Sequence, residues 1–376
     1  MHDPNFLQTL WFALIGVLWV GYFVLEGFDF GVGMLIRALG RDETDKRMII
    51  HTIGPVWDGN EVWLLTAGGA TFAAFPGWYS SLFSGFYLAL FLILAALIVR
   101  GVSFEFWGKS DSPRWRSTWE WTAVIGSLLA ALLWGVGWAN IVHGIAMNAH
   151  HDVTANLLDL LHPYALLGGL TTLSLFLGHG AIFLALRTRG EMAARARAVA
   201  ARVSIVTVAL MAAFLLWTGF DQDRGGVKIA AELIAALAVA LAAAVPALVR
   251  RERDGWAFGL SAGAIALLFA SLFVGLFPNA LPASNHASDL TLAAASSTHY
   301  TQTVMTVVAV IFVPIVLLYQ GWTYWVFRHR LGRDDFEGSL TPIAVLSKLG
   351  GKEGDGQDLG DGQPSRSTAP PLAPGS

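Results

Sequence analysis

The sequence contains no cysteine, so disulfides, thiolate zinc sites, iron–sulfur clusters and thiolate-ligated haem are excluded within this chain. Charged residues are also scarce, at 14% of the total, and the net charge of -3 gives no reason to expect a nucleic-acid partner. Phosphate-loop, catalytic-triad and zinc motifs are not found either. The chemistry of this chain must therefore be sought outside the common soluble enzyme motifs.

Apolar residues are abundant instead. They make up 55% of the 376 residues and form nine segments of roughly membrane-spanning length. This pattern predicts an all-α polytopic membrane protein with nine transmembrane helices. We expect no cleaved signal peptide, because the first segment has neither a basic flank nor a small-residue cleavage site. The predicted segments are 7–36, 48–75, 78–100, 117–142, 160–186, 199–219, 227–249, 255–277 and 302–327.

Positive charge alternates strictly between the loops. Alternate loops and the C-terminal tail hold 22 of the 24 Lys and Arg residues. Because cytoplasmic loops are enriched in Lys and Arg, we expect the N-terminus outside and the C-terminus in the cytoplasm of a bacterial inner membrane. Adding or removing one helix would destroy the alternation, so the loops support the number nine.

A faint internal repeat suggests how the helices are grouped. The end of the fourth segment, 128–140, is similar to the end of the eighth, 267–279. We therefore predict a four-helix unit over 1–145, a second over 146–280, and a peripheral ninth helix with its outer loop over 281–334. A cytoplasmic tail follows over 335–376, and its Gly/Pro/Ser-rich part from about 350 is predicted to be disordered.

Four carboxylic acids lie within the first two apolar segments. Glu26 and Asp29 are three residues apart, as are Asp58 and Glu61, so each pair shares one helix face. Pro55 precedes the second pair and loosens the backbone there, because it cannot donate a helical hydrogen bond. Acids at membrane depth are costly and usually functional. They predict a proton or ion path, with a purely structural role as the alternative.

The turn near Asp42 sets the relative depth of these acids. Glu26 and Asp58 are equally far from it in sequence, so we expect them at similar depth and Asp58 to be buried. Gly27, Gly31 and Gly33 flank the first pair of acids, and small residues at such spacing favour close helix packing.

Two other residue types need an interpretation. Arg100 ends an apolar run, which favours snorkelling to the interface over pairing with a buried acid. His179 is the only histidine well inside a segment, and we expect it to be packed or hydrogen-bonded. No histidine pair has the arrangement of a bis-histidine haem site, so neither a cofactor nor a metal site is assigned to this chain.

Long motifs then show a family resemblance. Residues 27–33, 54–63, 67–76 and 83–87 resemble subunit II of the cytochrome bd-type quinol oxidases, in the order and spacing of that family. The resemblance covers nearly all of 5–330. It implies nine helices and a heterodimer with a subunit I that binds two haems b, one haem d and the quinol. It leaves open a small accessory subunit, and also a bound quinone, which some members hold in subunit II.

The resemblance also implies roles for single residues. Asp58 matches the acid that the family assigns to the cytoplasmic proton route, and Asp29, Trp57 and Arg100 match positions linked with function or assembly. Glu120 stands where other members carry Asp. The implied function is coupling of quinol oxidation to reduction of oxygen to water, within a complex that also contacts lipid. A secondary transporter or ion channel using the buried acids is the alternative, and a pure assembly scaffold is a third reading.

Overall fold

The computed structural model describes residues 3–221 and 225–336. The chain divides into two compact units, Met1–Arg333 and Asp334–Ser376. Helices dominate the described residues, and the sheet formed by β1 (Asn279–Leu281) and β2 (Leu290–Thr291) is small. The all-α prediction is therefore confirmed. The predicted disorder from about residue 350 lies outside the described residues.

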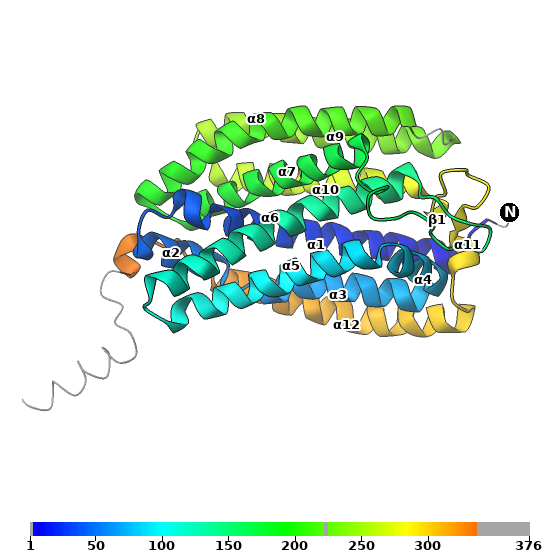
Figure 1. Cartoon of the computed structure of the whole chain (residues 1–376), viewed down its shortest axis with the longest axis horizontal. Coiled ribbons are helices and arrows are strands. Elements are labelled where there is room, and N and C mark those ends of the chain that lie inside the picture. The colour runs from blue at the N-terminus through cyan, green and yellow to red at the C-terminus, as the bar shows by residue number, and fades with distance from the viewer. Residues whose placement is uncertain (1–2, 222–224, 337–376) are drawn as a thin grey trace, which may run out of the picture. The chain divides into compact units, whose positions relative to one another are not determined.

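The helices of the first unit run back and forth along one direction (Figure 1). Up to residue 143 they are α1 (Phe6–Leu39), α2 (Glu43–Ile53), α3 (Trp57–Ala74), α4 (Pro76–Gly85), α5 (Tyr87–Phe106), the 3-10 helix η1 (Trp107–Lys109) and α6 (Pro113–His143). The later ones are α7 (Pro163–Arg187), α8 (Gly190–Asp221), α9 (Gly225–Arg250), α10 (Asp254–Leu276), α11 (Leu292–Ala295) and α12 (His299–Val326). A 3-10 helix, η2 (Arg333–Asp335), follows.

Within the described ranges, eight helices are long and apolar enough to cross a membrane, judged by length and composition. They are α1, α5 with η1, and α6, α7, α8, α9, α10 and α12. The multi-pass prediction is thereby confirmed. The remaining predicted segment, 48–75, does not qualify: α2 has only 11 residues, and the 18 residues of α3 include the polar Asp58, Asn60 and Glu61 and are not apolar enough.

Two of the predicted segments are broken in the structure, which corrects their boundaries. The segment 48–75 is interrupted between Ile53 and Trp57, where Gly54 is followed by Pro55. Proline cannot donate the helical hydrogen bond, so the break falls where the sequence weakens the backbone. The segment 78–100 is instead divided at Phe86 into α4 and α5, and α5 continues to Phe106.

The helix starts follow the usual sequence signals. The Asn5 side chain accepts from the backbone N–H of Gln8, whose own side chain accepts from Asn5, and together they form a capping box. Proline occupies the first turn of α4, α6 and α7, where its missing N–H costs nothing. Local sequence thus fixes where these helices begin.

Helix α1 lies in the middle of the bundle and contacts α3, α6, α7 and α10 (Figure 1). Its approach to α7 depends on two glycines. A Cβ built on Gly31 would lie 2.1 Å from the backbone oxygen of Phe176, and one on Gly180 would lie 2.5 Å from Gly31. The predicted close packing around Gly31 is confirmed, and it holds the first helices of the two sequence halves together.

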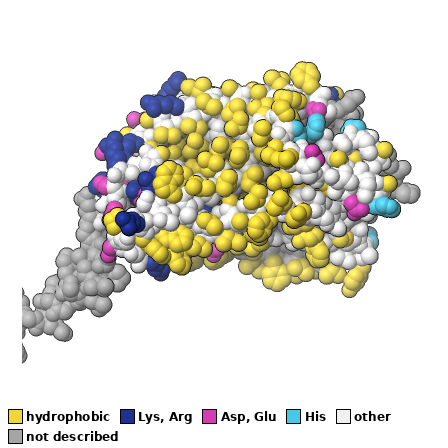
Figure 2. Space-filling view, viewed as in Figure 1, with side chains coloured by type: hydrophobic (Ala, Val, Ile, Leu, Met, Phe, Trp, Pro, Cys, Tyr) yellow, Lys and Arg dark blue, Asp and Glu magenta, His cyan; other side chains and the backbone are white. Residues whose placement is uncertain are grey.

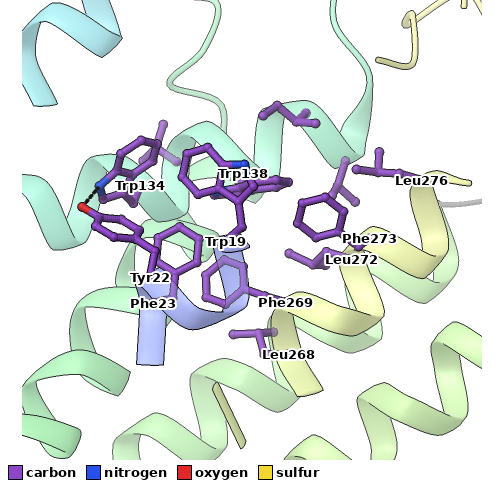
Figure 3. Close-up of a cluster of buried hydrophobic side chains, with 14 of the residues drawn as sticks. Trp19, Tyr22, Phe23, Trp134, Trp138, Leu268, Phe269, Leu272, Phe273 and Leu276 are labelled. Carbon is purple, nitrogen blue, oxygen red and sulfur yellow. Dashed lines mark hydrogen bonds between the residues drawn. The ribbon is translucent and has the colours of Figure 1, made fainter. Parts of the chain in front are cut away.

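An aromatic core joins α1 to α6 and α10 (Figure 3). Phe23 stacks on Phe269 with 3.9 Å between ring centroids, and Trp138 packs edge-on against Phe269. The indole N–H of Trp134 donates to the hydroxyl oxygen of Tyr22 at 3.1 Å, so these buried polar atoms are paired. This core fixes the N-terminal half of α1, and the C-terminal half carries the acids.

Lys and Arg side chains gather at one end of the bundle, where α2 lies, and histidines lie toward the other end (Figure 2). Ion pairs connect the helices at the basic end. Asp45 is fully buried and binds Arg195 at 2.7 Å and Arg333 at 2.8 Å. Arg333 also binds Asp42 at 2.8 Å. The chain that follows α12 is thus held at the start of α2.

Candidate functional site

Two of the four predicted acids bind one arginine inside the bundle, and a third is hydrogen-bonded to the asparagine next to one of them. Glu26 and Asp29 come from α1, Glu61 from α3 and Arg100 from α5, and Asn60 of α3 lies beside them. We call these five residues the acid–arginine cluster. All except Glu61 are fully buried, and the Glu61 side chain is 24% exposed. Burial of this many ionisable groups makes the cluster the candidate functional site of this chain.

Arg100 is the centre of the cluster. Its Nη1 lies 2.5 Å from Glu26 Oε1 and 2.8 Å from Glu61 Oε1. The guanidinium also stands over the rings of Phe30, at 4.9 Å, and Phe104, at 5.2 Å. The snorkelling interpretation is therefore wrong, because α5 continues past residue 100 and two carboxylates lie within reach of its side chain.

Asp29 is held by a different chain of hydrogen bonds. The Asn60 amide nitrogen donates to Asp29 Oδ2 at 2.7 Å, and its carbonyl oxygen accepts from Tyr324 at 2.8 Å and Gln320 at 3.3 Å. The oxygen of Gln320 accepts from the Trp63 indole at 2.7 Å. Helix α12 is thereby connected to α3 and, through Asn60, to α1.

Sequence reasoning missed Asn60, Gln320 and Tyr324. Asn60 lies directly before Glu61 within the best motif of the chain. Gln320 and Tyr324 are four residues apart on the largely apolar helix α12, so they share one face. This spacing of two polar side chains is the sequence signal that could have identified Gln320 and Tyr324.

Asp58 differs from the other acids. It is exposed in the first turn of α3, so the expectation that it is buried within this chain is wrong. Glu26 shares its arginine with Glu61 and not with Asp58, the residue equally far from the turn. Counting residues from the turn assumed a continuous helix, whereas the break around Pro55 changes the rise along the chain.

The remaining predicted residues have structural contacts. Glu120 is 3% exposed and binds Arg37 at 2.6 Å and Lys46 at 2.9 Å. Trp57 packs against Phe104 with 5.7 Å between ring centroids. Glu120 thus joins α6 to α1 and α2, and Trp57 joins the start of α3 to the end of α5.

His179 is buried and hydrogen-bonded, as predicted. Its Nδ1 lies 2.7 Å from the Ser261 hydroxyl and its Nε2 lies 3.2 Å from the carbonyl oxygen of Val24. The ring stacks on Phe258. Because both ring nitrogens have partners, neither is available to a metal. In the described part of the chain, no group of three or more His, Cys, Asp or Glu could hold a metal ion.

Comparison with known proteins gives consistent results. Residues 7–327 match the family described as cytochrome bd terminal oxidase subunit II. Subunit 2 of the cytochrome bd ubiquinol oxidase of Bacillus subtilis is 41% identical over 334 residues, which cover 88% of this chain and 98% of that protein. Subunit 2 of the cytochrome bd-I ubiquinol oxidase of Escherichia coli K12 is 37% identical, covering 90% and 98%.

The fold also matches a solved structure, that of the bd oxidase from Geobacillus thermodenitrificans. The TM-score is 0.71 at 16% identity, and the match covers 86% of this chain and 99% of that one. This structural match supports the fold, and the sequence relatives show the family. The chain belongs to the cytochrome bd terminal oxidase subunit II family.

Proposed function

We propose that this chain is the second subunit of a membrane quinol oxidase that reduces oxygen to water, and that it supplies part of the proton route from the cytoplasm. The observation that carries the proposal is the acid–arginine cluster, in which a buried guanidinium binds Glu26 and Glu61. Family membership favours an oxidase over the transporter alternative.

Charge balance supports a proton-handling role. Three carboxyl groups of the cluster face one guanidinium, so full ionisation would leave two negative charges without compensation at membrane depth. Asp29 Oδ1 and Glu26 Oε2 have no hydrogen-bond partner among the described residues. A proton shared among these carboxyls lowers the electrostatic cost, and a group that holds a proton there can also release it.

The exposed position of Asp58 supports a partner at this face. An ionisable side chain in contact with lipid is costly. The neighbouring surfaces of α3 and α5 are apolar, with Leu65 70% exposed and Phe91 61% exposed. We therefore propose that subunit I covers this face, and that Asp58 passes protons between the cluster and that subunit.

The residues of this chain do not fit a haem. Both nitrogens of the buried His179 are hydrogen-bonded, and most other described histidines lie in or beside loops. Our proposal is that subunit I holds two haems b and one haem d and oxidises the quinol. A bound quinone and a small accessory subunit are compatible with this arrangement.

The proposed topology has nine crossings in a bacterial inner membrane, with the N-terminus outside. Helix α3 supplies the ninth crossing, because its 18 residues span about 27 Å at 1.5 Å per residue. The basic end then faces the cytoplasm, as the positive-inside rule requires. The helices group as units 1–145 and 146–280, followed by 281–334 and the tail over 335–376.

The test is Asp58→Asn in the complex, co-expressed with subunit I. Oxygen consumption should fall by about tenfold or more, since proton transfer by a positioned group contributes at least that much. Haem content should stay normal. Glu232→Gln is the matched control, because Glu232 is an exposed acid on another long helix, α9. Normal oxygen consumption by an intact Asp58→Asn complex would contradict proton transfer through Asp58 and leave only the scaffold role. Loss of haem would show instead that Asp58 has a structural role.

A further inference from the structure

A second site lies at the basic end of the bundle, and its lining includes Tyr324, which donates to Asn60 of the acid–arginine cluster. A cavity of about 700 Å³ opens between α7, α10, α12 and the break that separates α2 from α3. Cavities of this size are large enough for a ligand the size of a lipid headgroup with part of its chains.

Four arginines line this cavity, and three of them are free of carboxylates. Within 3–221 and 225–336, no Asp or Glu lies within ion-pair distance of Arg187, Arg253 or Arg328. The two acids of the lining, Glu252 and Asp254, bind Arg197, and Asp254 also binds Arg330. The cavity therefore carries uncompensated positive charge.

The N-terminus of α10 adds to this charge. The helix begins at Asp254, directly after Arg253, and extends over 23 residues. Backbone N–H groups at such an end favour an anion, because the helix dipole places partial positive charge there. The helix dipole adds to the positive potential that the arginines already create in the cavity.

The walls of the same cavity are apolar. Phe183, Phe258 and Phe327 line it beside the arginines. Two tryptophans near its rim lie in the position of an interfacial belt: Trp256 is 68% exposed, and Trp325 is 59% exposed with Arg328 stacked over its ring at 4.3 Å. The cavity thus combines arginines with an apolar wall of aromatic side chains.

We propose that this cavity binds an anionic phospholipid, with the phosphodiester between Arg187, Arg253 and Arg328 and an acyl chain along the phenylalanines. A basic pocket between helices at the membrane surface is the kind of site that selects anionic headgroups. A free phosphate would use the arginines but leave the apolar wall in water. The acidic C-terminal tail, with Asp355 and Asp358, would also match the charge but would not fill the apolar wall.

The test uses the full chain in complex with subunit I, purified in detergent and depleted of lipid. Dioleoyl phosphatidylglycerol or dioleoyl phosphatidylcholine is added, and bound lipid is counted by native mass spectrometry. We expect phosphatidylglycerol to bind in preference. Replacing each arginine by glutamine should weaken its binding about fivefold, the equivalent of about 1 kcal/mol per basic residue.

Controls separate the possible occupants. Arg251→Gln is the matched variant, because Arg251 lies in the same loop, is exposed and does not line the cavity. Should half-buried Arg187 be needed for folding, the exposed Arg253 and Arg328 carry the test. Equal binding of the two lipids, or variants that bind like Arg251→Gln, would overturn the proposal. So would displacement by inorganic phosphate, or stronger lipid binding after removal of residues 337–376.

Discussion

Arg100 Nη1 lies 2.5 Å from Glu26 Oε1, and both side chains are fully buried. A buried ion pair contributes little net stability, but removing one partner leaves an uncompensated charge in the interior. This asymmetry makes the pair a good test of the cluster. This ion pair joins helix α1 to helix α5.

Arg100→Gln should destabilise the complex by about 3–5 kcal/mol, because Glu26 and Glu61 lose their common partner. The thermal midpoint and the yield of assembled complex measure the effect. The double variant Glu26→Gln with Arg100→Gln removes the buried charge as well, so it should recover part of the loss. A double variant as unstable as the single one would contradict the ion-pair account.

Tyr324→Phe removes one hydroxyl that donates to Asn60 and leaves the ring in place. We expect a loss of about 1 kcal/mol, because the amide oxygen of Asn60 then keeps only the longer bond from Gln320. Tyr319→Phe on the same helix is the control, since Tyr319 is 66% exposed. Equal thermal midpoints for the two variants would show that α12 is not held through Asn60.

Gly31→Ala should strongly destabilise the protein, because the new Cβ would overlap the Phe176 carbonyl oxygen on α7. Separating two packed helices costs about 1–3 kcal/mol or more, which the thermal midpoint reports. Gly259→Ala in α10 is the control, since its Cβ would meet nothing within 4 Å. A Gly31→Ala protein as stable as this control would disprove the close contact of α1 with α7.

Acid stability should depend on Asp42. The hydrogen bond from Arg333 holds the pKa of this carboxyl below its ordinary value, and the backbone N–H of Asp45 adds to the effect. A lowered folded-state pKa stabilises the protein above about pH 3.9, and that contribution disappears as the pH falls through the lowered value.

Asp42→Asn keeps a residue able to cap α2 but removes the charge. We expect it to be less stable than the wild type at neutral pH by at most about 1 kcal/mol, because the ion pair is partly exposed. The difference in thermal midpoint should shrink below about pH 4. Asp3→Asn, an exposed position, should show no such convergence. A difference that stays constant with pH would rule out the charge as its cause.

Most of the helices could be predicted from the sequence, because the length of an apolar run and the charge of its flanks are local properties. The break at Phe86 was not predictable, since no proline marks it. The partner of Arg100 was not predictable either, because residue spacing reveals faces of one helix and not which helices meet. Asn60 and Tyr324 were missed for the same reason: their hydrogen bond joins residues 264 apart.

The central claim is that protons reach the oxygen-reducing subunit through Asp58. The rates of internal proton uptake and of oxygen consumption, measured together in proteoliposomes that contain the complex, test it most directly. With Asp58→Asn, uptake and oxygen consumption should fall together, at normal haem content, and Asp58→Glu should restore both. Uptake and turnover that match those of the Glu232→Gln control would contradict the account.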